Sequence, residues 1–79
     1  MLKLKIISPE EVVYDGEAES VKVPGTMGAF EILQNHAPII SALMDGVVEY
    51  KAPDGVKTLK VKGGFVEVQK NEVNLCVEV

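Results

Sequence analysis

With 79 residues and an apolar fraction of 47%, the chain is long enough for one small domain over residues 1–79 and too apolar to be disordered. The net charge of −4, with eight scattered lysines and no arginine, argues against the basic face that nucleic-acid binding requires. One cysteine and one histidine exclude an internal disulfide and argue against a closed zinc site, so no metal or other cofactor is expected.

No segment has the pattern of a membrane span or a secretory signal. The apolar runs fall far short of the roughly 18 residues that a spanning helix needs, and the N-terminal MLKLKIIS lacks an apolar core and a cleavage site. The lone thiol favours a reducing, cytosol-facing compartment. Because a core of this size rarely supplies more than about 3–5 kcal/mol of net stability, docking onto a partner should reinforce the fold.

The beginning of the chain predicts three short strands. In residues 1–8 apolar side chains alternate with lysines, the pattern of a half-buried strand. A second strand begins over residues 12–14 and ends at the Asp15-Gly16 turn signal. Residues 17–23 resume the extended pattern as a third strand.

Residues 24–46 form the one stretch that does not show plain strand alternation. It holds three of the seven glycines, two of the four prolines and the only histidine. Such a composition favours loops of fixed shape. Short strands are expected over residues 27–33 and 37–43, with a turn at residues 34–36 and an Asp-Gly turn at the end. We interpret this stretch as the functional surface and the rest as the scaffold that presents it.

The remainder of the chain predicts four strands joined by short turns. Turn signals stand at residues 53–55 and 71–72. The pair Gly63-Gly64 indicates a bulge or a close approach of two backbones. The four strands are expected over residues 47–52, 57–62, 65–70 and 73–79.

The composition and spacing together predict an all-β fold. Thirteen valines and five isoleucines dominate the apolar set, and β-branched side chains fit pleated surfaces better than helices. Turn signals recur about every 8–12 residues, and no window keeps a helical period without a Gly or Pro interrupting it. We therefore expect a small β-sandwich of two mostly antiparallel sheets with about 8–10 short strands.

Isolated reactive residues do not add up to a catalytic site. His36 invites a catalytic or pH-sensing interpretation, but a ring that bonds loop carbonyls beside Pro38 is favoured. Nucleophilic catalysis needs a placed serine or cysteine and an orienting acid. Neither Ser41 nor Cys76 stands in such a context, so the chain is not expected to be an enzyme.

The glycine-containing loop leaves one question open. Gly25-x-x-Gly28 opens no helix and lacks the Gly-Lys-Ser/Thr ending of a phosphate loop, so it predicts a tight turn. Met27 and Phe30 are costly at a loop tip unless something covers them. They either fold back onto the sandwich or form a contact patch.

Two kinds of binding module have a similar pattern of short strands and turns. A free-standing β-sandwich module that binds its partners by edge-strand addition is the alternative function. A lipoyl- or biotinyl-carrier domain would display a lysine at a hairpin tip, and the expected tips carry none. These tips are Asp15-Gly16, Asp45-Gly46, Asp54-Gly55 and Asn71-Glu72.

Two long runs carry a resemblance to a known family, VPGTMGAFEILQNHAPIISALMDGVVEY and VKGGFVEVQKNEVNLCVEV. The family pattern is a Pro-Gly turn, a glycine-containing loop, His-Ala-Pro before an aliphatic pair, a strand-opening glycine, and Gly-Gly before an aliphatic-Val-Glu-Val strand. By this pattern the chain resembles the N-terminal β-sandwich domain of the epsilon subunit of the F-type ATP synthase. The matching positions are Pro24, Gly25, Gly28, His36, Ala37, Pro38, Ile39, Ile40, Gly46 and residues 63–68.

The resemblance implies a rotor subunit of the proton-translocating F-type ATP synthase. In that family the domain lies at the foot of the central stalk, with one face on the gamma subunit and the loops of one end on the c-ring. It couples gamma to the ring for ATP synthesis and catalyses nothing itself. The implied location is the cytoplasmic face of the bacterial inner membrane, peripheral, within the F1 sector. The domain would be a monomer when isolated and membrane-associated only through the complex.

The resemblance also assigns residues to the two surfaces. The gamma-facing set is Ser8, His36, Ile40 and Ser41, and the ring-facing loop is Thr26, Met27, Gly28, Ala29, Phe30 and Glu31. Two positions depart from the family pattern. The loop carboxylate is displaced to Glu31, so ring contact is expected to differ in detail. Asn35 replaces the glycine before the histidine and preserves the turn, because Asn tolerates left-handed geometry.

One further expectation concerns the last residues. Most bacterial and chloroplast members continue into a C-terminal helical hairpin that can restrain ATP hydrolysis and in some members binds ATP. The sequence given ends at Val79, after its last strand. The resemblance therefore implies a short form that lacks the hairpin, with no support for nucleotide binding or self-inhibition.

Overall fold

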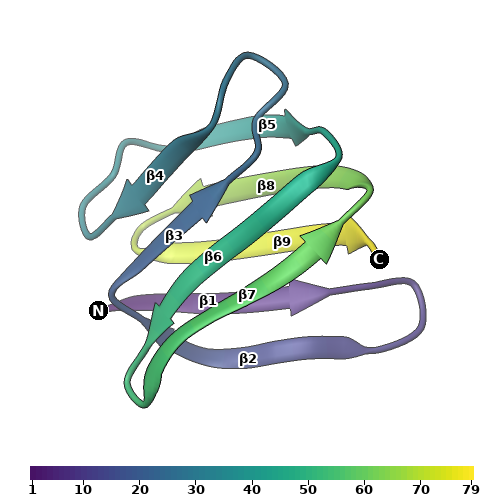
Figure 1. Cartoon of the computed structure of the whole chain (residues 1–79). Helices are drawn as coiled ribbons and strands as arrows, with labels where there is room; N and C mark the ends of the chain where they lie inside the picture. Colours follow the sequence, from purple (N-terminus) through teal and green to yellow (C-terminus); the bar gives the residue numbers. More distant parts are fainter.

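Nine strands and no helix make up the computed structural model, which describes residues 1–79 (Figure 1). The all-β prediction is therefore confirmed. The chain contains no helix long and apolar enough to cross a membrane. The strands are Leu2–Ile7 (β1), Val12–Ala18 (β2), Ser20–Val23 (β3), Phe30–Leu33 (β4), Ile39–Leu43 (β5), Gly46–Ala52 (β6), Gly55–Val61 (β7), Gly63–Gln69 (β8) and Glu72–Glu78 (β9).

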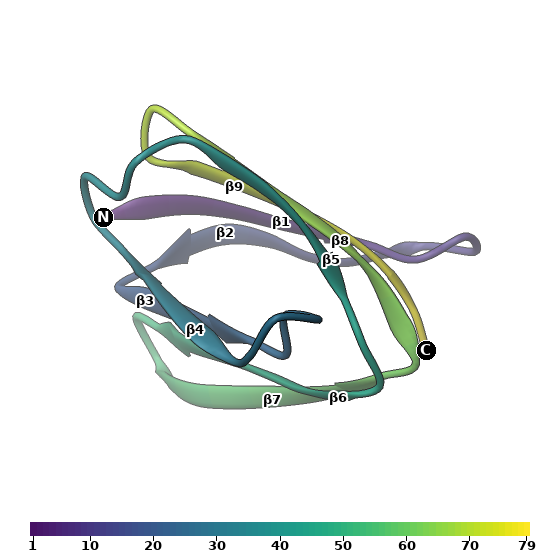
Figure 2. The same cartoon turned by 90° about the horizontal axis from the view of Figure 1, so that it is seen from above.

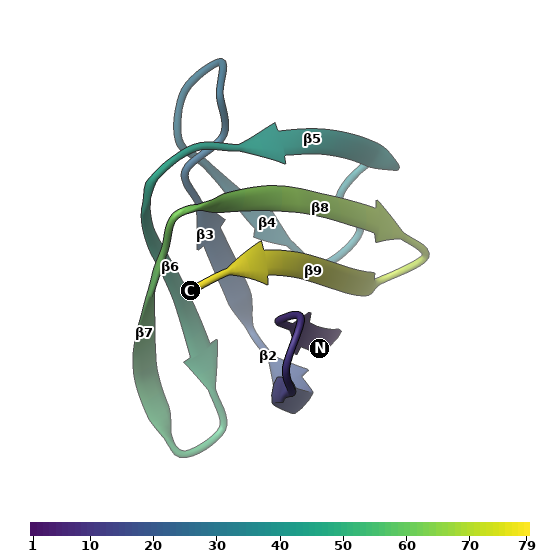
Figure 3. The ribbon, with the colours of Figure 1, turned by 90° about the vertical axis from the view of Figure 1, so that its right-hand side faces the viewer.

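The strands form two layers, as the sequence predicts (Figure 2). One is a five-stranded sheet in the order β2-β1-β9-β8-β5, and the other is a four-stranded sheet in the order β4-β3-β6-β7. All neighbouring strands are antiparallel except β1 and β9, which are parallel. The chain crosses between the layers after β2, β4, β5 and β7. Strands of the four-stranded sheet run diagonally across those of the other sheet (Figures 1 and 3).

The core lies between the two inner faces. In β1 the buried Leu2, Leu4 and Ile6 alternate with outward-facing lysines, and β6, β8 and β9 follow the same period of two. Burial of one such side chain stabilises the fold by about 1.5–3 kcal/mol. The buried apolar cluster is Leu2, Leu4, Ile6, Ala18, Val21, Val23, Ile32, Leu43, Val48, Tyr50, Ala52, Val61, Val66, Val68, Val73, Leu75 and Val77.

The turn predicted at Asp15-Gly16 is wrong. Both residues lie inside β2, where Asp15 pairs with Lys5 and Gly16 with Leu4 of β1. A side chain at Gly16 would clash with Tyr14, because a Cβ there would come within 2.9 Å of the Tyr14 hydroxyl oxygen. Tyr14 lies back over Gly16, and its hydroxyl donates a hydrogen bond to the Glu17 carbonyl at 2.7 Å.

Tyr14 also connects the two sheets. Its ring centroid lies 4.8 Å from that of the buried Tyr50 on β6, with the rings tilted by 46°. Burial is the main cause that raises the pKa of Tyr50 above its ordinary value. The strand expected over residues 17–23 is divided into two, because the chain leaves one sheet at Ala18 and enters the other at Ser20.

The hairpin tips differ in part from the predicted ones. A turn is confirmed between β6 and β7, but its tip is Pro53-Asp54 rather than Asp54-Gly55, because Gly55 already pairs with Ala52. The β8–β9 tip is Lys70-Asn71 rather than Asn71-Glu72, because Glu72 already pairs with Gln69. A lysine therefore does stand at a hairpin tip, and the ground on which a carrier domain was excluded is wrong.

Gly64 confirms the predicted close approach of two backbones. Its φ is +139°, and a Cβ there would collide with the Cys76 carbonyl oxygen and lie 2.8 Å from the Val77 Cα. The neighbouring Gly63 has space, since its Cβ would meet nothing nearer than the Leu43 carbonyl oxygen at 3.5 Å. Only Gly64 of this pair is therefore required by backbone conformation and by the approach of β9.

We expect Gly64→Ala to lower the free energy of unfolding by more than about 3 kcal/mol, because it combines backbone strain with a clash against β9. Gly63→Ala is the matched control and should change this free energy by no more than about 0.5 kcal/mol. Urea unfolding of the two variants and the parent chain measures the difference. Equal losses in both variants would contradict the account of Gly64.

Candidate functional site

The predicted ring-facing loop projects beyond the body of the sandwich, at the top in Figure 1. It makes a tight turn, in which the Gly28 amide donates to the Gly25 carbonyl at 3.0 Å, and Gly28 has a φ of +127°. Met27 at the tip is 99% exposed. The turn predicted from Gly25-x-x-Gly28 is therefore confirmed.

This loop is bound to strand β5 by backbone hydrogen bonds. The Thr26 amide donates to the Ala42 carbonyl at 3.1 Å, and the Met44 amide donates to the Pro24 carbonyl at 2.8 Å. Gly25 also forms an isolated antiparallel bridge with Leu43. The base of the loop is thereby fixed to the opposite sheet, so the tip is presented in a defined position.

The two apolar residues of the loop have different roles. The Phe30 side chain is half-buried and packs against the core, and a Cβ at Gly25 would come within 2.9 Å of its ring. Met27 stays in solvent. Of the two alternatives left open by the sequence, folding back holds for Phe30 and exposure holds for Met27. Glu31, the last residue of the predicted loop, lies in β4 opposite Lys22.

The predicted gamma-facing residues at the two ends of the sandwich are held by local hydrogen bonds. Ser8 is only 6% exposed, and its hydroxyl bonds both the amide and the carbonyl of Glu11 at 3.2 Å. The half-buried His36 bonds the Ala37 carbonyl oxygen through Nδ1 at 2.7 Å. This confirms the predicted bond between the His36 ring and a loop carbonyl.

Ile40 and Ser41 are neighbours on β5 and therefore lie on opposite faces. Ile40 is 73% exposed on the outer face of the five-stranded sheet. Ser41 has the same orientation as the buried Leu43, and its hydroxyl donates to the Ala42 carbonyl at 3.2 Å. The structure thus does not bring the four predicted residues together on one patch.

An apolar row that sequence reasoning missed crosses the outer face of the five-stranded sheet. Neighbouring strands pair Ala42 with Phe65, Phe65 with Cys76, Cys76 with Ile7, and Ile7 with Val12. Ile40 pairs with Glu67 and is therefore the diagonal neighbour of Phe65. We call the six residues the outer apolar band: Ile7, Val12, Ile40, Ala42, Phe65 and Cys76.

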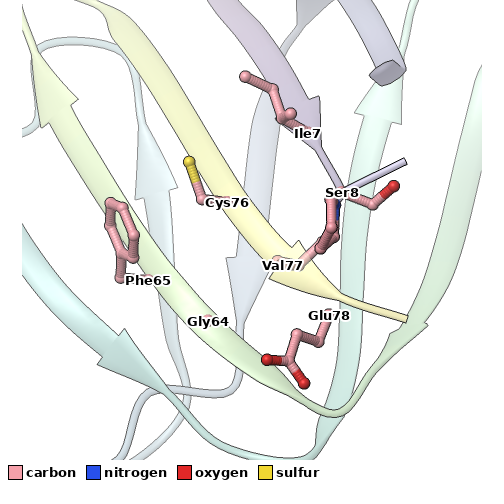
Figure 4. A pocket seen from close by; sticks show the side chains of 8 residues that line it. Ile7, Ser8, Gly64, Phe65, Cys76, Val77 and Glu78 are labelled. Carbon is pink, nitrogen blue, oxygen red and sulfur yellow. The ribbon is translucent and has the colours of Figure 1, made fainter. Parts of the chain in front are cut away.

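A shallow groove of about 370 Å³ lies on this band (Figure 4). The Phe65 ring and the Cys76 thiol point to the same side in the close-up, with Ile7 beyond them. Glu78 and the turn after Ser8 form its polar end. The rest of the outer face is charged, with Lys3 opposite Glu72 and Lys5 opposite Asp15. A polar rim around an apolar centre is the usual anatomy of a docking surface.

No group of three or more His, Cys, Asp or Glu side chains lies close enough to hold a metal ion. The His36 ring is engaged with its own loop. The outer face of the four-stranded sheet carries lysines and glutamates paired across strands, such as Lys22 with Glu49, together with the exposed side chains of Leu33, Val47 and Val56.

Comparison with known proteins gives one family and a consistent set of relatives. The family model described as ATP synthase, Delta/Epsilon chain, beta-sandwich domain matches residues 1–79. The chain is 43% identical over 77 residues to the ATP synthase epsilon chain of Leptospira interrogans, covering 98% of this chain and 61% of the relative. It is 43% identical over 76 residues to the epsilon chain of Gloeothece citriformis, covering 96% and 55%. The chain thus spans less than two thirds of these relatives.

Two solved structures share the fold. One is from the Euglena gracilis mitochondrial ATP synthase OSCP/F1/c-ring, with a TM-score of 0.89 at 19% identity, covering 96% of this chain and 49% of the other. The second is from the Tetrahymena thermophila mitochondrial ATP synthase central stalk/c-ring, with a TM-score of 0.84 at 12% identity, covering 99% and 63%. At these identities the likeness establishes the architecture.

The different burial of the two loop residues predicts different effects on stability. Met27→Ser should leave the free energy of unfolding within about 0.5 kcal/mol of the parent, because the side chain touches little. Phe30→Ala should lower it by about 1–3 kcal/mol through lost packing. Thermal or urea unfolding measures both. A large loss in the Met27 variant would mean that the tip packs onto the body.

Proposed function

Because the chain belongs to the family of ATP synthase delta/epsilon chain β-sandwich domains, we propose that it is a non-catalytic part of the central stalk that couples the gamma subunit to the c-ring. The observation that supports the proposal is the presence of two separate exposed apolar features on one body, each suited to docking. The outer apolar band lies on a sheet face, and the Met27 loop projects from an edge of the sandwich. A coupling element needs two such surfaces, whereas a simple ligand-binding module needs one.

The proposed mechanism is mechanical. Rotation passes through the domain only if neither surface yields under load. The close-packed core gives the body low compressibility, and the loop is bonded to β5 at its base. A specific interface of standard size buries roughly 800 Å² per partner, so each contact should extend beyond the residues assigned to it below.

We assign the outer apolar band to the gamma subunit. Val12, Ile40 and Phe65 are its exposed large side chains, and hydrophobic burial contributes about 25 cal/mol per Å² removed from water. Ser8 borders the groove at one end of the sheet, and His36 lies in the loop just before Ile40. Ser41 supports the backbone of β5 from the inner side. The predicted gamma-facing set is thus extended along the sheet.

We assign the loop from Thr26 to Glu31 to the c-ring. Thr26, Met27, Gly28 and Ala29 are exposed and would make the contact. Phe30 packs against the core at the base of the loop, and Glu31 lies on the outer face of β4 rather than at the tip. The carboxylate would therefore approach the ring from the side of the four-stranded sheet.

The proposed location follows from these partners. As a part of the F1 sector, the chain would be peripheral, on the cytoplasmic face of a bacterial inner membrane, and held there by gamma and the ring. Isolated, it would be a monomer. Binding by edge-strand addition is the alternative function, and β2 and β7 are the uncovered long edges. Lys57 and Lys60 on β7 are typical of an edge protected against pairing.

Substitutions on the band test the gamma assignment. Ile40→Asp and Phe65→Asp should each weaken binding to the gamma subunit by at least about tenfold, because a charge would be desolvated against an apolar partner. Val56→Asp, at an exposed position on β7 of the four-stranded sheet, is the matched control and should bind like the parent. Calorimetry or surface plasmon resonance gives the affinities. Unchanged affinity in both band variants would reject the gamma-facing assignment.

Crosslinking tests the orientation. With Met27→Cys in a Cys76→Ser background, a short bifunctional reagent should join the loop to the c-ring in the assembled complex. Thr58→Cys, on the outer face of the four-stranded sheet, is the control and should give a different partner or none. Mass spectrometry identifies the products. Crosslinks from the loop only to the catalytic head would reverse the proposed orientation.

A further inference from the structure

Asn71 connects three segments that are distant in the sequence. Its backbone carbonyl accepts a hydrogen bond from the Lys3 amide at 2.8 Å, which fixes the start of β1. Its side-chain Oδ1 accepts a hydrogen bond from the Asn35 amide at 2.6 Å, and its Nδ2 donates to the Asn35 Oδ1 at 3.4 Å. The β8–β9 tip and the β4–β5 loop lie together at the left end of the sandwich in Figure 1.

The backbone geometry at this point is unusual on both sides of the contact. Lys70 and Asn71 have φ values of +50° and +62°, and Asn35 has a φ of +66°. These are the only residues other than glycine with positive φ in the structure. Two consecutive residues of this kind form the tight turn that suits a two-residue hairpin. The contact therefore joins two strained turns, each stabilised by an asparagine.

The other contacts of the β4–β5 loop, which we define as residues 34–38, are local or exposed, apart from the His36 ring, whose centroid lies 6.4 Å from that of Phe30. Within it, the His36 amide donates to the Leu33 carbonyl at 3.1 Å, and the His36 ring bonds Ala37. The N-terminal amine donates to Gln34 Oε1 at 3.3 Å in an exposed position. The loop has to cross from β4 in one sheet to β5 in the other. The Asn35–Asn71 contact is thus its main link to a rigid hairpin.

We propose that Asn71 is a positioning residue, whose side chain holds the β4–β5 loop in the shape that docks on the gamma subunit. The inference rests on the function proposed above, since it takes the gamma contact of His36 and Ile40 as given. When the contact is made, His36 and the start of β5 are already in the bound conformation. When it is lost, the loop samples other conformations, and the apparent dissociation constant rises by the inverse of the docking-competent fraction.

Three variants of the full chain separate the side chain of Asn71 from its backbone. Asn71→Gly removes the side chain and retains the positive φ. Lys70→Gly is the matched control, because it introduces the same glycine flexibility at the adjacent position of the turn, where the side chain makes no hydrogen bond. Asn71→Asp retains an acceptor oxygen for the Asn35 amide, and the Asn35 side-chain amide can rotate to donate to it.

Two measurements are made on each variant. Amide hydrogen exchange, read by NMR, reports whether Asn35 and His36 remain protected. Titration against the gamma subunit gives the dissociation constant. For Asn71→Gly we expect the Asn35 amide to exchange at least about fivefold faster and gamma binding to weaken about three- to tenfold, the effect of one net hydrogen bond. Lys70→Gly and Asn71→Asp should match the parent in both, within about twofold.

Each contrary result has a definite meaning. Exchange at Asn35 that is equal in the Asn71→Gly and Lys70→Gly variants would overturn the contact itself. Faster exchange with unchanged gamma affinity, while Ile40→Asp still weakens binding, would overturn the positioning role and leave the proposed function in place. Loss of affinity in Asn71→Asp as large as in Asn71→Gly would overturn the role of the acceptor oxygen. Unchanged gamma affinity in the Ile40 and Phe65 variants would instead reject the proposed function.

Discussion

The rest of the structure depends on the packing of two valine-rich inner faces against each other. Because side chains alternate along a strand, every residue committed to the core sends its neighbours outward. An apolar residue beside a core residue is therefore placed on the outside, where it contributes nothing to the core. The outer apolar band consists largely of such residues. Ile7 follows the buried Ile6, Phe65 precedes the buried Val66, and Ile40 lies between inward-facing neighbours.

Local patterns in the sequence predict most of the strands and the two-layer architecture, because alternation and turn residues act over a few positions. The errors occur where a residue serves a distant or unusual neighbour. Gly16 makes space for Tyr14 rather than a turn, and Lys70 accepts a positive φ that the sequence suggests for glycine or asparagine. The parallel pairing of β1 with β9 joins the two ends of the chain, and no local signal marks it. Since that pairing places Ile7 beside Cys76, the outer apolar band could not be read from the sequence.

The loop proposed to meet the c-ring and the β4–β5 loop that leads to Ile40 are held in different ways. The Met27 loop is fixed by backbone hydrogen bonds to β5, which require no particular side chain. The β4–β5 loop relies on the side chain of Asn71 and on turns with left-handed residues. Backbone bonds tolerate sequence change, whereas the second arrangement is lost with a single substitution. If the chain acts as a rotor element, the position of His36 would then depend on one side-chain amide, whereas the outer apolar band and the Met27 loop would be held by backbone pairing.

The central position of β1 and β9 in the five-stranded sheet also bears on how the protein is made. Strand β1 is synthesised long before β9. Until β9 is available, β1 can pair only with β2. Strands β5 and β8 join the β1–β2 pair only through β9, which lies between β8 and β1. Folding of this domain should thus await the synthesis of β9 and be slow for a domain of this size, because contacts between strands far apart in the sequence carry the largest loop-closure cost. A nascent chain that stalls before β9 would present two half-sheets with open edges, the form most exposed to aggregation.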